Sequence, residues 1–174
     1  MTSIARFTTW VSRPPFPAIR KSALQKYDTA SGAEAPGSRR MRLYALADLH
    51  LGYRRNREAL REWPAHPDDW LILAGDVGET LAHLELGLAA ATDRFAQVFW
   101  VPGNHELWSH RTEGPRGVAK YEAAVEVCRR LGVLTPEDPY VSWPGQPACV
   151  IAPLFVLFDY TFRPDSVAPE DAVT

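Results

Sequence analysis

Five polar residues of metal-binding types occur in three short motifs along the chain. Asp48 and His50 stand two positions apart in ADLH, so an extended backbone is expected to project both side chains to one side. Asp76 stands in AGDVG, and Asn104 and His105 are adjacent in PGNHE. Carboxylates and a neutral imidazole bind divalent Mn, Fe or Zn, and an amide oxygen adds an uncharged donor. The three motifs together predict a metal site.

The same donor set predicts a reaction class. A carboxylate placed between two metal sites can bridge both ions and hold them roughly 3.5–4 Å apart. Two ions at that separation lower the pKa of a shared water and draw charge off a phosphoryl group, which favours in-line attack. We therefore expect metal-assisted hydrolysis of a phosphoester.

Each motif alone also has a purely structural explanation. Asp48 and His50 could form a surface pair or cap a helix, and Asp76 could belong to an ordinary turn. Asn104 and His105 could cap the start of a helix. Three separate turns that all present metal-ligand types are a much less economical explanation, so the joint pattern favours a site.

Apolar runs and helical patterns supply the elements that must position these side chains. Short apolar runs at 41–47, 70–75 and 97–101 predict buried strands, each ending at one of the motifs. Residues 54–63 and 81–95 have helical patterns between them. Strands that alternate with helices predict an α/β domain with a largely parallel sheet, in which ligands bind at the carboxyl ends of the strands.

The pattern continues toward the C-terminus. Apolar residues at helical spacing predict a helix over 118–131, and Gly132 is expected to end it. Residues 148–158 predict a fourth strand and leave room for a fifth.

The motifs D-x-H, G-D and G-N-H-E, in this order and each after a strand, closely resemble those of the calcineurin-like metallophosphoesterase superfamily. The resemblance implies an α/β/β/α sandwich and a phosphatase or phosphodiesterase that uses two divalent ions (Mn, Fe, Zn or similar) and a metal-bound hydroxide. It implies that Asp48 and His50 bind the first ion, that Asp76 bridges both, and that Asn104 binds the second. It gives His105 a catalytic role at the transition state without metal ligation.

The resemblance extends over roughly residues 41–160 and covers the N-terminal half of the family's fold. Family members complete the site with a later histidine and a G-H-x-H motif, whereas no histidine follows His110 here. Two explanations are open: a chain truncated at its C-terminus, or a degenerate, non-catalytic relative that acts as a binding module. We favour truncation.

Charge divides the chain into two parts. Residues 1–40 carry seven Lys/Arg and two acids, whereas residues 41–174 carry twelve and nineteen. The first part is expected to be disordered, or an upstream extension of a protein that starts at Met41, and the second to be the metallophosphoesterase domain. The acidic balance of residues 41–174 argues against a duplex nucleic-acid binder. We expect no membrane segment and a cytoplasmic location.

Several further residues carry weaker expectations. Arg54, and beside it Arg55, could reach a substrate phosphate or could be solvated in a first helical turn. Cys128 and Cys149 are expected to be buried free thiols. Glu106 is expected to orient the loop around Asn104. No chemical role is expected for the remaining histidines or for residues expected in the core or in loops: His66, His83, His110, Trp100, Trp108 and Asp159.

Overall fold

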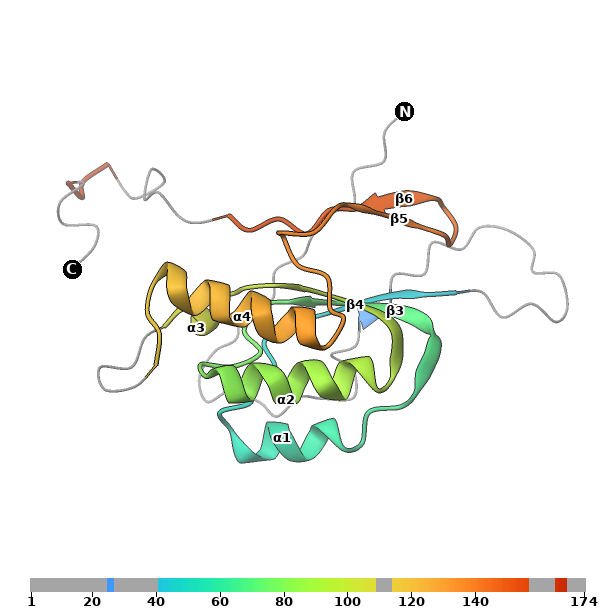
Figure 1. Cartoon of the computed structure of the whole chain (residues 1–174), viewed down its shortest axis with the longest axis horizontal. Helices are drawn as coiled ribbons and strands as arrows, with labels where there is room; N and C mark the ends of the chain where they lie inside the picture. The colour runs from blue at the N-terminus through green and yellow to red at the C-terminus, as the bar shows by residue number, and fades with distance from the viewer. Residues whose placement is uncertain (1–24, 27–40, 109–113, 157–164, 169–174) are drawn as a thin grey trace, which may run out of the picture.

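The main sheet contains three parallel strands that follow one another along the chain. The structure is a computed structural model that describes residues 25–26, 41–108, 114–156 and 165–168. The sheet order is β1-β2-β3-β4, and β2 pairs parallel with β3, as β3 does with β4 (Figure 1). The parallel strands are β2 (Leu43–Leu46), β3 (His66–Ala74) and β4 (Phe95–Val101).

Helices connect these strands along one face of the sheet. Helix α1 (Arg54–Leu60) joins β2 to β3, and α2 (Leu81–Thr92) joins β3 to β4. After the short α3 (Asn104–Leu107), helix α4 (Val118–Arg130) packs against α2 on the same face (Figure 1). Because every crossover returns the chain to the same starting end, the three strands finish at one edge of the sheet.

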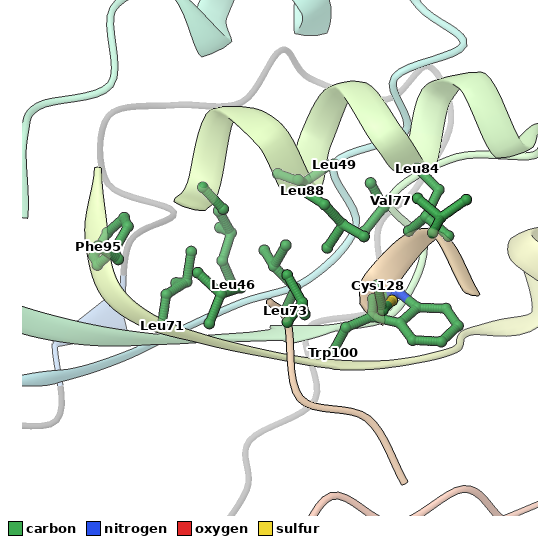
Figure 2. Packing of buried hydrophobic residues seen from close by; sticks show 14 of the residues in the cluster. Leu46, Leu49, Leu71, Leu73, Val77, Leu84, Leu88, Phe95, Trp100 and Cys128 are labelled. Carbon is green, nitrogen blue, oxygen red and sulfur yellow. The ribbon is translucent and has the colours of Figure 1, made fainter. Parts of the chain in front are cut away.

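The two faces of the sheet bury different residues because side chains alternate along each strand. Leu71 and Leu73 of β3 and Trp100 of β4 face the helices and are fully buried with Leu84 and Leu88 of α2 (Figure 2). Their neighbours in sequence face the other way. This helix-side core fixes α2 against the strands that end at the predicted site.

A small hairpin covers the opposite face. Strands β5 (Val141–Trp143) and β6 (Cys149–Ile151) pair antiparallel in a separate two-stranded sheet. Trp143 packs against Trp70, with ring centroids 5.2 Å apart, and joins Phe99 and Ile151 in a second core cluster. The hairpin therefore completes a sheet-on-sheet layer.

The α/β class, the parallel sheet and the helix that ends before Gly132 are confirmed, and Gly132 has the left-handed φ of 68° expected at such an end. The fourth strand predicted within 148–158 is present as β6, but it is only three residues long and belongs to the hairpin rather than to the main sheet. Pro153 follows shortly and cannot donate a ladder hydrogen bond. Residues 157–158 lie outside the described ranges.

Two smaller observations concern the ends and the thiols. In the N-terminal segment the structure describes β1 (Gln25–Lys26), which pairs antiparallel with β2. Cys128 is buried and free as expected, whereas Cys149 is free but exposed. No helix among the described residues has the length and hydrophobicity needed to cross a membrane.

Candidate metal centre

The loops after β2 and β3 are joined by backbone hydrogen bonds that extend the sheet beyond its strands. The Asp48 N–H donates to the Gly75 carbonyl at 3.1 Å, and the His50 N–H donates to the Asp76 carbonyl at 2.9 Å. Leu51 donates in the same way to Val77 at 2.8 Å. These hydrogen bonds therefore fix the loop that contains the first motif beside the loop that contains the second.

Apolar side chains alternate with the polar ones in these loops. Leu49, Leu51 and Val77 are fully buried in the helix-side core. Gly87 of α2 permits the close packing, because a Cβ there would lie 2.6 Å from a Val77 methyl carbon. Burial of the leucines and the valine fixes the loops from beneath, while the intervening polar residues stay at the edge of the sheet.

Three of the predicted site residues have left-handed backbone. Among the described residues, positive φ outside glycine occurs at Asp48 (59°), His50 (43°) and Asp76 (54°). The expected extended backbone between Asp48 and His50 is therefore wrong. Such conformations cost on the order of 1–3 kcal/mol each and cluster at functional sites, where the surrounding structure imposes them. This strain, confined to the metal-ligand types, supports a functional site.

Two glycines allow the second and third motifs to touch. A Cβ on Gly75, whose φ is 86°, would lie 2.7 Å from the Gly103 nitrogen. A Cβ on Gly103 would lie 2.1 Å from Asp76 Oδ1. Real Cβ atoms cannot make such contacts, so G-D and G-N require glycine to bring two strand ends into backbone contact.

Glu106 holds that contact from inside. Its carboxylate accepts the N–H groups of Gly103 at 2.8 Å, Asp76 at 3.0 Å and Val77 at 2.5 Å, and the residue is only 4% exposed. Burial raises the pKa of this carboxyl, and the backbone donors oppose the rise without cancelling it. Glu106 therefore joins the two loops through three backbone N–H groups, in agreement with the orienting role expected for it.

The donor atoms converge at the edge of the sheet. His50, Asp76 and His105 each offer an atom within 4.8 Å of the others, and Asp48 Oδ1 lies 3.6 Å from His50 Nε2. The hydrogen bond that His50 donates to the Asp48 carboxylate raises the pKa of His50, against the opposing effect of burial. Asn104 is exposed as the first residue of α3. This set of carboxylates and imidazoles has the chemistry that a divalent ion requires.

The sequence interpretation missed Glu79. Its Oε1 lies 3.2 Å from His105 Nδ1, and its Oε2 lies 3.7 Å from Nδ1 of His83, a residue without an expected role. Burial alone would raise the Glu79 pKa, but hydrogen bonds from its own backbone and from His105 leave the pKa below its usual value. The signal available in the sequence was a carboxylate three positions after Asp76.

Trp108 also contacts the His105 ring. The two ring centroids lie 3.7 Å apart with an interplanar angle of 37°, and Trp108 is 51% exposed. The expected core position of Trp108 is therefore wrong, whereas Trp100 is fully buried as expected. His105 is held between a carboxylate on one nitrogen and an indole on its face.

Other candidates lie apart from this cluster or outside the described residues. The Arg54 side chain is 86% exposed and pairs with Glu58 at 2.8 Å. His66 begins β3, at the opposite end of the sheet from Asp76. His110 and Asp159 lie outside the described ranges.

Comparison with known proteins places this geometry in a family. The calcineurin-like phosphoesterase family matches residues 41–146, which include all three motifs. The chain belongs to the calcineurin-like phosphoesterase family. The resemblance stated from the motifs is thereby confirmed, and the divalent-ion chemistry of this family agrees with the donors that converge here.

Both a sequence relative and a solved structure similar to this chain have the name PptH. The [acyl-carrier-protein] phosphodiesterase PptH of Mycobacterium tuberculosis is 42% identical over 140 residues, which cover 78% of this chain and 43% of the relative. The crystal structure of the phosphopantetheinyl hydrolase PptH from the same organism matches with a TM-score of 0.69 and 39% identity, over 74% of this chain and 47% of that one. The chain thus spans about half the length of the relative it matches.

Proposed function

We propose that this chain contributes the metal-binding half of a phosphoester hydrolase active site. The observation that carries the proposal is the convergence of His50, Asp76 and His105, whose donor atoms lie within 4.8 Å of one another at the ends of three strands. Left-handed backbone at two of these three residues adds support, because a fold keeps such strain where its function needs it.

The residues divide by the chemistry of their donors. Asp48 and His50 would bind one divalent ion, Asp76 would be shared between two, and Asn104 would bind the second. Mn, Fe and Zn suit these carboxylate, imidazole and amide ligands. Bound ions would supply Lewis acidity, which draws charge from a phosphoryl group and lowers the pKa of water.

His105 is proposed as the group that donates a proton to the leaving oxygen. With the Glu79 carboxylate 3.2 Å from Nδ1, the favoured tautomer carries its proton on that nitrogen. Nε2 is then the nitrogen available to a substrate. The contact with Glu79 also orients the ring toward that substrate.

The substrate proposal comes from the relatives. The names of the PptH proteins point to a phosphodiester that joins a phosphopantetheinyl group to acyl-carrier-protein. We propose the same class of phosphodiester here: water loses a proton and attacks phosphorus, the bond from phosphorus to the protein oxygen breaks, and that oxygen takes a proton from His105.

A second candidate is a metal-binding module without turnover. Among the proposed ligands, the second ion has only Asp76 and Asn104, which are few ligands for an ion that must polarise a phosphoryl group. This candidate predicts metal binding in the absence of hydrolysis.

The test is an assay of the full chain on bis(4-nitrophenyl) phosphate and on holo-acyl-carrier-protein, with added Mn²⁺ or Zn²⁺. Hydrolysis that chelator and Asp76→Asn both abolish supports the enzyme. Metal binding without hydrolysis supports the binding module. Failure to bind any divalent ion refutes both candidates. The matched control variant is Arg130→Met, because Arg130 is the last residue of α4 and none of the proposed site residues.

A further inference from the structure

A buried lysine on α4 reaches two loops of the candidate centre. Lys120 is only 6% exposed, and its Nζ donates to the Glu79 carbonyl at 2.8 Å. The same Nζ donates to the carbonyl of Trp108, at the end of α3. Helix α4 provides none of the proposed metal ligands, but these hydrogen bonds connect it to the site.

The two carbonyls belong to the residues that flank the His105 ring. The Glu79 side chain lies 3.2 Å from His105 Nδ1, and the Trp108 ring lies 3.7 Å from the imidazole, centroid to centroid. One ammonium group thus holds the backbone of two residues that contact this ring. These neighbours come from different loops, and Lys120 joins them directly.

The electrostatic surroundings suit a charged lysine in this position. Burial lowers the pKa of Lys120, whereas the carboxylates of Glu106 and Glu79 oppose that change. An ammonium is a compact donor of three hydrogen bonds on a flexible stem, so it can satisfy two carbonyls of differing direction. A neutral side chain of equal length would fill the volume and leave both carbonyls without this donor.

We propose that Lys120 is a positioning residue that sets the orientation of the His105 imidazole through the Glu79 and Trp108 backbones. The effect of Lys120 on the orientation of the ring does not depend on the proposed function. The expected effect on kcat rests on the proposed function.

The direct test is a spectrum of the histidine rings. In ¹⁵N-histidine-labelled full chain without metal, long-range ¹H–¹⁵N correlations report the tautomer and surroundings of each ring, and the His105 signals are assigned by their loss in His105→Gln. We expect Lys120→Met to shift the His105 signals and to leave those of His66, at the other end of the sheet, in place. Arg130→Met removes an exposed cation on the same helix that pairs with Glu85, and it should shift neither.

The kinetic test separates positioning from general stability. Misplacement of a catalytic group by about 1 Å costs on the order of 10²-fold in rate. We expect Lys120→Met to lower kcat by about 10- to 100-fold, with Mn²⁺ affinity and KM within about twofold of wild type. Should wild type lack activity, the proposed function fails and the histidine spectrum still decides the role of Lys120.

The following outcomes with Lys120 variants would refute the positioning role. Unshifted His105 signals in a folded Lys120→Met protein would refute it, as would equal loss of Mn²⁺ affinity and kcat. If that variant does not fold, Lys120→Arg replaces it: the guanidinium keeps the charge but its planar fork cannot place donors at the same points. His105 signals identical to wild type in folded Lys120→Arg would then refute the proposal, and shifted signals would support it.

Discussion

Both ends of the main sheet carry a histidine beside a carboxylate, but the two ends are built differently. At the carboxyl end, His105 Nδ1 lies 3.2 Å from Glu79 Oε1. At the amino end, His66 Nδ1 lies 3.1 Å from Asp69 Oδ2. The residue types and the distances are nearly the same, so neither can decide which end has a function.

The amino-end pair is a structural unit within one strand. Asp69 is fully buried and accepts the Arg42 N–H at 2.9 Å, which ties β2 to β3. The His66 ring stacks on Phe95 with centroids 5.1 Å apart. The pair therefore serves the packing of adjacent strands.

The carboxyl end differs in its backbone and in its number of contributors. Three strand ends supply its donors, and the described residues outside glycine with positive φ all lie there. Convergence and strain, rather than residue type, distinguish a candidate site from a core pair.

The largest expected effect comes from replacing one aspartate at each end of the sheet, Asp76 and Asp69. Asp76→Ala should lower Mn²⁺ affinity by at least about 100-fold, more than the 10- to 100-fold that losing an outer partner of a metal ligand costs. Asp69→Ala should leave Mn²⁺ affinity unchanged and instead lower the free energy of unfolding by about 2–3 kcal/mol, because it removes the charged acceptor of the part-buried Arg42 N–H. Calorimetric metal titration and chemical denaturation measure the two effects.

Similar behaviour of the two variants would contradict the proposed difference between the two ends of the sheet. Comparable loss of metal affinity in both aspartate variants would mean that the amino end also contributes to binding. Comparable loss of stability without a change in metal binding would mean that Asp76, like Asp69, is structural.

The next effect separates two roles within the carboxyl end. His105→Ala should lower kcat by roughly 10²-fold or more, the range typical of a lost general acid, and keep most of the Mn²⁺ affinity. His66→Ala is the matched variant at the amino end, and its kcat should stay at the wild-type value. Metal titrations of both variants check that His105 does not bind metal. If His105→Ala lost as much Mn²⁺ affinity as Asp76→Ala, His105 would be a metal ligand.

The placement of the site was predictable, because apolar runs determine where strands end and parallel strands end at one edge. The order of strands and motifs in the sequence is therefore enough to locate Asp76 and His105 at neighbouring strand ends, where the structure has them. Glycine before Asp76 and before Asn104 also marks the places where chain segments touch.

Other features depend on contacts between distant residues. Lys120 lies 41 positions from Glu79, and no local pattern joins them. The left-handed backbone at Asp48 and His50 follows from hydrogen bonds to another loop, so the alternation rule for strands misjudged it. The first strand of the hairpin, Val141–Trp143, was missed because three residues are too few for a periodic signal.

The smallest expected effect tests the Glu79–His105 pair by pH. Since the folded-state pKa of Glu79 lies below its reference value of 4.5, the carboxylate stabilises the fold above that value, and this contribution is lost as pH falls through the folded pKa. Metal-free wild type should therefore exceed Glu79→Gln in free energy of unfolding by under about 1 kcal/mol near neutral pH, and the excess should shrink toward pH 3. Chemical denaturation of both proteins over that range measures the excess. An excess that grows as pH falls would show that Glu79 is held in its protonated form, and the pair would then be a neutral hydrogen bond rather than a contact with an ionised carboxylate.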